Sequence, residues 1–203
     1  LRWRDVRWID RRDIELAYDG QIDFDPGWRP RHALAERAGA SPPARLRLDR
    51  EGRNDRWQTR IDVAGGSWNG VSRFETLDNG RLRVSAELVP RDVDIEALVQ
   101  TFGRRTFVAG KLHGQTTLTA EADKAGALMR GLRTRTVFSV SPATLTKLDL
   151  AKAVSTAGIS RGGRTVLDEL SGTLDTEATP DGTVLRYTGL KARSGVLTAS
   201  GNV

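Results

Sequence analysis

Few residues of this sequence could do chemistry, and those few do not form a catalytic or metal-binding pattern. Its two histidines, His32 and His113, lie far apart, and neither stands at metal-ligand spacing from other donors. Cysteine is absent, which excludes disulfides, thiolate metal sites and cysteine nucleophiles. No nucleophile elbow, phosphate-binding loop or zinc-peptidase motif occurs. The sequence therefore predicts a protein that is not an enzyme and that holds no metal and no cofactor.

Three carboxylates gather at Asp19, Asp23 and Asp25. Calcium needs ligands that converge in one tight loop followed by a glutamate. Here Ile22 and Phe24 alternate with the acidic residues, which is typical of a strand with one solvated face. We expect these carboxylates to be surface residues rather than ligands.

Arginine dominates the charge of the chain. There are 32 Lys and Arg against 26 Asp and Glu, a net charge of +6. Two explanations stay open: a genomic bias in codon use, or contact with phosphates of lipid headgroups, lipopolysaccharide or nucleic acid, which arginine binds bidentately. Charges of both signs are mixed along the whole chain, so neither half is a basic arm. Nucleic acid is therefore not expected as the main partner.

The tryptophans all lie in the first 68 positions, at Trp3, Trp8, Trp28, Trp57 and Trp68. They could anchor the core, or they could form interface rings at a membrane surface. Packing in a core or against a sheet is the favoured interpretation. Trp28, which lies among prolines and glycines, is the best candidate for contact with lipid or a partner.

The elements that must position these side chains are β-strands. Apolar and polar residues alternate in five stretches, which lie near residues 44–49, 57–63, 81–88, 108–120 and 170–178. One-sided alternation favours antiparallel pairing. Hairpin signals separate the strands at 51–52, 64–66, 78–80 and 180–182. The pattern predicts a mainly β fold, an extended curved antiparallel meander of roughly ten strands.

Helices and loops are expected only between these strands. Three short helices are predicted at 93–102, 123–132 and 149–159, the first of them capped by Asp94. Prolines and glycines interrupt residues 26–43, which we expect to form a long, partly mobile loop with a turn or two of helix at 31–37. A second loop is expected at 158–164.

Such a meander has two faces, and three short helices cover little of either. If the sheet curls, its apolar row lines a groove that suits acyl chains, because about 0.8 kcal/mol is gained per CH₂ removed from water. A packed sandwich with a closed core fits the composition equally well. In either case the residues expected to line the groove or core are Leu112, Leu118, Phe138, Leu174 and Leu197. We treat residues 1–203 as one β-rich module and leave open a subdivision near Phe107.

From Leu82 onward the chain resembles the C-terminal region of the AsmA-like family of Gram-negative envelope proteins. The similar segments are a strand leading into a helix, a strand of small residues, a short helix, a Leu-Asp-Leu step and two further strands. They lie at residues 81–98, 108–118, 125–132, 146–150, 163–172 and 195–203. Residues 44–71 are similar more loosely. Leu167 stands where phenylalanine is usual, and Thr146-Lys147 replaces a glycine.

The resemblance implies an inner-membrane anchor followed by a large periplasmic β-groove. It further implies a role in phospholipid transport between the inner and outer membranes and in outer-membrane integrity, without catalytic residues. The chain starts without Met, so we expect a fragment of a periplasmic protein that a missing N-terminal anchor tethers to the inner membrane. The expected partner is phospholipid or another envelope lipid. The alternative is an envelope scaffold that binds a protein partner by its edge strands.

Overall fold

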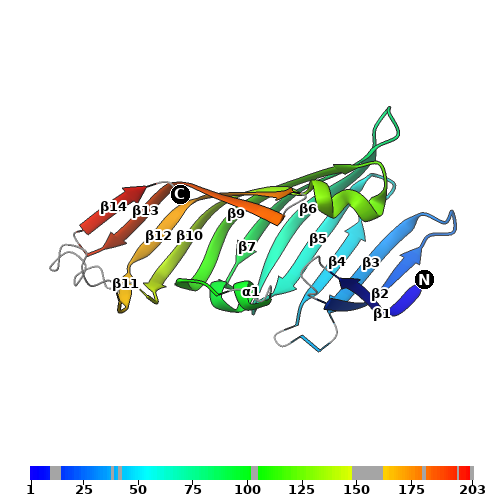
Figure 1. Ribbon diagram of the computed structural model, residues 1–203. Helices are drawn as coiled ribbons and strands as arrows, with labels where there is room; N and C mark the ends of the chain where they lie inside the picture. Colours follow the sequence, from blue (N-terminus) through cyan, green and yellow to red (C-terminus); the bar gives the residue numbers. More distant parts are fainter. Residues whose placement is uncertain are drawn as a thin grey trace.

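The computed structural model describes residues 1–9, 15–37, 39–40, 43–101, 105–147, 162–179, 182–195 and 197–201. In this part of the chain, fourteen antiparallel strands form one sheet. The sheet is an open, curved layer with a groove-like shape (Figure 1). The predicted mainly β, curved antiparallel meander is therefore confirmed, although with more strands than the sequence pattern indicated.

The strands follow one another closely along the chain, and each is named here with its bounds. The N-terminal half contains β1 (Arg2–Ile9), β2 (Glu15–Phe24), β3 (Pro30–Arg37), β4 (Arg45–Arg50), β5 (Arg56–Val63), β6 (Gly66–Thr76), β7 (Leu82–Arg91) and the short β8 (Val93–Asp94). The C-terminal half contains β9 (Val108–Ala122), β10 (Arg133–Leu145), β11 (Thr165–Leu167), β12 (Glu169–Thr179), β13 (Gly182–Ser194) and β14 (Leu197–Gly201).

The topology is almost a pure meander. The order across the sheet is β1-β2-β3-β4-β5-β6-β7-β9-β10-β12-β13-β14, with β8 added to β9 and β11 added to β10. Glycines at positive φ, such as Gly52 (60°), Gly65 (71°) and Gly80 (77°), make the tight turns that the sequence predicted at these places. At the turn after β6, the side chain of Asn79 also accepts a hydrogen bond of 3.0 Å from the Arg81 N–H.

The expected loop at 26–43 is wrong over its central part, because β3 occupies Pro30–Arg37. Ala33 and Ala35 pair with Leu48 and Leu46 of β4, so β3 fills the space between β2 and β4. Small side chains at alternate positions fit a pleated surface, and a proline at the first residue of a strand costs no ladder hydrogen bond. The prolines and glycines therefore bound a strand rather than marking one long loop, and no helical turn forms at 31–37.

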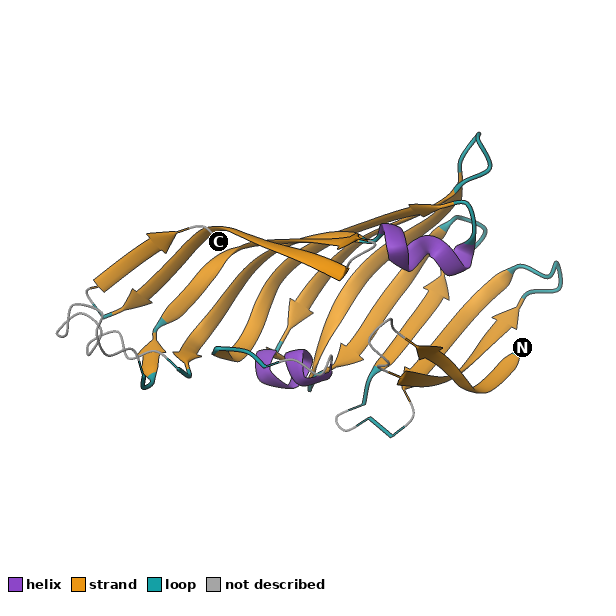
Figure 2. Cartoon of the chain, in the orientation of Figure 1, coloured by secondary structure: helices purple, strands orange, loops and turns teal. Residues whose placement is uncertain are grey.

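Two short helices flank β9 in the chain and lie at opposite edges of the sheet, where strands end (Figure 2). Helix α1 (Ile95–Thr101) begins as expected, because the Asp94 carboxylate accepts a hydrogen bond of 2.9 Å from the Ala97 N–H. The predicted helix at 123–132 is the 3₁₀ helix η1 (Ala125–Gly131). The predicted helix at 149–159 and most of the loop at 158–164 lie outside the described residues. Neither described helix has the length and apolar character that crossing a membrane requires.

The tightest packing lies toward the C-terminal side of the sheet. Phe138, Val140 and Ala143 of β10 form a buried cluster with Leu167 of β11, and Ile95 of α1 packs against it. A second set of buried side chains follows the middle strands; its members include Trp57, Ser72, Ala86 and Leu88. Among the described side chains of β1 to β4, none is buried.

Candidate functional site

The register of the sheet separates its two faces by chemistry. Residues directly opposite one another on neighbouring strands share a face, so a row can be followed from β2 to β13. One such row is Ile22, Ala33, Leu48, Thr59, Gly70, Leu88, Thr116, Thr136, Leu174 and Tyr187. It crosses ten strands without a charge, and we call the face that carries it the apolar face.

The neighbouring row on the opposite face has a different composition. It runs Asp23, His32, Asp49, Gln58, Val71, Glu87, Thr117, Arg135, Asp175 and Arg186. Each residue of this row is a sequence neighbour of a residue in the uncharged row, as strand alternation requires. We call this the polar face. Within these two rows, charge lies on one side of the sheet only. Beyond them the apolar face carries two arginines, Arg37 opposite Tyr18 and Arg50 opposite Trp57.

Hydroxyl groups on the apolar face bond to each other across strands. Thr59 donates to Ser72 over 2.7 Å, and the hydroxyls of Thr116 and Thr136 lie 3.0 Å apart. The hydroxyls of Thr134 and Thr176 form a third pair, at 2.6 Å. These hydrogen bonds supply partners for the polar atoms of the apolar face from within the face itself. Among the described residues, no buried side-chain polar atom lacks a partner.

The structure brings together three of the five residues predicted to line a groove or core. Phe138 is buried, at 8% exposed, and Leu112 and Leu174 pack partly buried against its cluster. Leu118 is half-buried on the same face, opposite Ala86 and Thr134. The backbone of Leu197 lies in β14 opposite Ser194, away from the others.

The apolar face is covered in one part of the sheet and open in another. Around Phe138 the apolar face is closed, because Ile95 of α1 packs against the buried cluster, to which Leu167 of the neighbouring strand β11 belongs. Toward the N-terminus the same face stays partly open: Leu46, Ile61 and Trp68 lie directly opposite one another and each keeps part of its surface exposed. This open portion has the chemistry to hold alkyl chains.

Sequence reasoning missed Trp68 and Ile61 as lining residues. The alternation around Ile61 was visible, but it identified only a strand with one dry face. Nothing local to Trp68 shows which face its ring occupies; that follows only from its register opposite Ile61 and Pro90. The five tryptophans differ in burial. Trp57 is buried, Trp3 and Trp68 are half-buried, and Trp28 is exposed, while the side chain of Trp8 is outside those that the structure describes.

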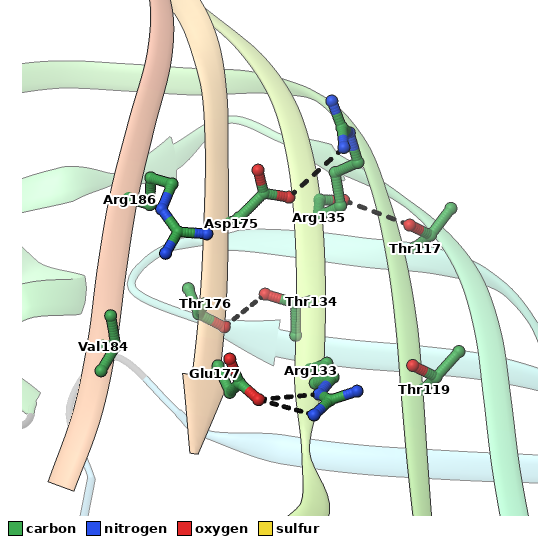
Figure 3. A pocket seen from close by; sticks show the side chains of 10 residues that line it. All are labelled: Thr117, Thr119, Arg133, Thr134, Arg135, Asp175, Thr176, Glu177, Val184 and Arg186. Carbon is green, nitrogen blue, oxygen red and sulfur yellow. Dashed lines mark hydrogen bonds and ion pairs between the residues drawn. The ribbon is translucent and has the colours of Figure 1, made fainter. Parts of the chain in front are cut away.

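The best-defined cavity lies on the polar side, across β9, β10, β12 and β13 (Figure 3). It has a volume of about 300 Å³ and is lined mainly by threonine, arginine and carboxylate side chains. Arg133 pairs with Glu177 at 2.6 Å, and Arg135 pairs with Asp175 at 3.7 Å. Exposed pairs of this kind contribute little to stability, and they make the cavity unsuitable for an alkyl chain.

The histidines and the aspartate cluster take part in local contacts. His32 Nδ1 lies 2.6 Å from Asp49 Oδ1, and His113 Nε2 lies 3.4 Å from Asp92 Oδ1. Within the described ranges, no three His, Asp or Glu side chains converge as metal ligands would. Asp25 instead shapes the turn after β2, where hydrogen bonds from the backbone N–H groups of Arg29 and Gly27 lower its pKa.

Neither a protein-family model, nor a curated protein, nor a solved structure matches this chain. The resemblance of residues 82–203 to the AsmA-like family therefore stays a prediction.

Proposed function

We propose that this chain is a non-enzymatic lipid-binding module of an AsmA-like periplasmic protein that is tethered to the inner membrane. Its apolar face would hold the acyl chains of phospholipids that move between the inner and outer membranes. The observation that supports this most is the uncharged row that crosses the curved sheet from β2 to β13.

The energetics favour an alkyl ligand on this face. Each CH₂ that leaves water gains about 0.8 kcal/mol, so the binding free energy grows with the length of alkyl chain that the open part of the face covers. The threonine hydroxyls already bond to each other, so they offer no directional contact that would fix a ligand at one place. A lipid chain could therefore slide along the face while its headgroup stays in water.

The test is native mass spectrometry of the chain purified from Gram-negative cells, with extraction of the bound lipids. Leu118→Asp places a charge on the half-buried apolar face. Val137→Asp makes a similar change on the neighbouring strand at a 56% exposed position of the polar face. We expect phospholipid on the wild type and on Val137→Asp, and loss of it from Leu118→Asp.

Circular dichroism must show that both variants keep the β spectrum of the wild type. A wild-type chain free of lipid that also fails to take up a fluorescent phospholipid would contradict the proposal. Equal loss of lipid from both variants would also contradict it, because the effect would then not depend on the face.

A second candidate is an envelope scaffold that binds a protein partner by strand addition. It is favoured by the position of β14, which has β13 as its only strand partner among the described residues. An exposed edge strand is a template for pairing with another chain. Thr198→Lys with Ser200→Lys would then abolish capture of the partner and leave lipid content unchanged, whereas the lipid-binding proposal predicts that these changes are silent.

A further inference from the structure

The turn between β2 and β3 displays an aromatic side chain to solvent. Trp28 is 83% exposed, the highest value among the large apolar side chains that the structure describes as exposed. Phe24, 37% exposed, lies beside it, with the ring centroids 6.0 Å apart and the rings tilted by 50°. An indole left in water without packing against the sheet calls for a partner.

The turn holds this indole rigidly. One carboxylate oxygen of Asp25 accepts hydrogen bonds from the N–H groups of Gly27, at 2.8 Å, and Arg29, at 3.0 Å. The Trp28 N–H donates to the Asp25 carbonyl at 3.0 Å, and the Asp25 N–H donates to the Arg29 carbonyl at 2.9 Å. Trp28 itself has a φ of 58°, in the left-handed region that non-glycine residues rarely adopt. These hydrogen bonds hold the backbone of the turn in the conformation from which the Trp28 side chain projects.

Charged side chains of both signs lie in this turn and in the adjoining one: Arg29, Arg31, Arg50, Arg53 and Arg56, with Asp23, Asp25, Asp49, Glu51 and Asp55. The turn between β4 and β5 lies alongside, since Arg50 Nη1 contacts the Pro30 carbonyl at 3.5 Å. In these two turns Arg50 pairs with Asp55 and Arg56 pairs with Glu51. Arg29, Arg31 and Arg53 are exposed, and among the described residues none of them has a carboxylate within ion-pair distance, although the charge of Arg29 helps to lower the pKa of Asp25.

We propose that the β2–β3 turn docks this edge of the sheet on an anionic lipid bilayer. The indole would enter the interfacial region, where tryptophan is favoured, and the exposed Arg29, Arg31 and Arg53 would bind lipid phosphates. A bilayer surface fits better than a protein, because an indole that is 83% exposed, with exposed arginines in the same turn and the adjoining one, needs no complementary pocket. Phe24 continues the alternation of Gly20 and Ile22, so the turn lies where the apolar face reaches the sheet edge. The inference stands without the proposed transport function.

The first test is flotation with vesicles of phosphatidylcholine, alone or mixed with phosphatidylglycerol. Trp28→Ser removes the indole, whereas Phe107→Ser removes an aromatic ring that is 61% exposed at the opposite edge of the sheet. We expect the affinity of Trp28→Ser for mixed vesicles to fall about tenfold. Phe107→Ser should bind as the wild type does.

The second test separates local from general charge. Arg29→Gln with Arg53→Gln removes two free cations beside the indole, and Arg105→Gln with Arg164→Gln removes two exposed cations at the opposite edge. We expect about a fivefold weakening for each arginine of the first pair, and little change for the second. Equal weakening by both pairs would overturn the proposal, because binding would then reflect net charge alone.

Failure of the wild type to bind either vesicle would also overturn it and would point to a protein partner for Trp28. The Leu118→Asp variant keeps the two proposals apart. It should float with mixed vesicles as the wild type does, even though it is expected to lose bound phospholipid.

Discussion

Strands β1 to β4 and strands β5 to β12 belong to one hydrogen-bonded sheet, yet they differ in how they bury side chains. The first group has no buried residue among its described side chains, while the second contains every buried residue of the strands. A single layer buries a side chain only where neighbours on the same face or an overlying segment cover it. Helix α1 provides such cover for the cluster of β10, and the neighbouring strand β11 adds Leu167 to it; no described helix covers β1 to β4 in this way.

The difference indicates that stability and binding surface are divided along the sheet. Backbone ladders and half-buried contacts hold the N-terminal strands, which should therefore open at lower free energy than the buried cluster. The same lack of cover leaves their apolar face accessible. The region best suited to bind a ligand is thus the region that contributes least to the core.

The largest difference between the two regions is expected from shortening one leucine in each. Leu167→Ala empties a site that is 1% exposed in the buried cluster, whereas Leu46→Ala shortens a half-buried side chain of β4. We expect the first to lower the free energy of unfolding by about 3 kcal/mol and the second by about 1 kcal/mol. Urea denaturation followed by circular dichroism measures both. Equal losses would mean that the two regions are packed alike.

The next largest loss of stability is expected from Gly70→Ala, in the middle of the sheet. A Cβ on Gly70 of β6 would run into the backbone carbonyl of Glu87 on β7, which cannot move without breaking the ladder. We expect Gly70→Ala to cost about 2 kcal/mol. Gly126→Ala in η1 is the control, because a Cβ there meets nothing within 4 Å, and it should be neutral or slightly stabilising.

Gly20→Ala is the corresponding substitution in the N-terminal strands. A Cβ there would meet the Leu34 carbonyl and the Trp3 ring, so Gly20→Ala is also expected to clash. If β1 to β4 open separately, this variant speeds amide exchange in those strands and leaves the global unfolding midpoint in place. A shift of the global midpoint equal to that of Gly70→Ala would show that the sheet unfolds as one unit.

Much of the architecture could be predicted from the sequence, because both of its determinants are local. Alternation in β5, β7, β9 and β12 fixes which side chains share a face, and glycine turns such as Gly80 fix how the strands connect. The Asp94 cap was also readable, since a carboxylate before an apolar helical stretch is a local signal.

The rest depends on contacts between strands that no local pattern encodes. Strand β3 was missed because its alternation is of alanine with larger residues, and it becomes apolar only when set against Leu46 and Leu48. The extent of the apolar face follows from the register of ten strands taken together. The sequence likewise could not show that Phe138 would be covered while Ile61 stays open, because α1 and β11 reach only the first of them.

Two hydroxyl pairs on the apolar face differ in burial, so removal of one hydroxyl from each pair should cost different amounts of stability. Thr59 and Ser72 are both buried, so Thr59→Val leaves the Ser72 hydroxyl without its partner and should cost about 1.5 kcal/mol. Thr134 and Thr176 are half-exposed, so water can replace the lost bond and Thr134→Val should cost about 0.5 kcal/mol or less. Thermal unfolding measures both. Adding Ser72→Ala to Thr59→Val should recover part of the loss, and no recovery would contradict the explanation.

The smallest expected effect is on the acid dependence of stability. Asp25 represents the N-terminal strands in this test, and Asp94 represents the strands that contain the buried side chains. The backbone N–H of Ala97, and then Lys111 Nζ at 3.3 Å, lower the pKa of Asp94; the Arg29 N–H lowers that of Asp25. Since both folded-state pKa values lie below the ordinary 3.8, each group contributes stability that is fully present above that value. This stability is lost as the pH falls through the lowered pKa.

Asparagine at either position still accepts the backbone hydrogen bonds but does not titrate. Asp94→Asn should therefore flatten the acid limb of global unfolding by a few tenths of a kcal/mol. Asp25→Asn should change only the acid dependence of amide exchange in β2 and β3. Carboxyl chemical shifts followed by NMR give the two pKa values directly. The contrary result is that Asp25→Asn moves the global unfolding midpoint as much as Asp94→Asn does. The N-terminal strands would then unfold together with the buried cluster, and separate opening of β1 to β4 would be contradicted.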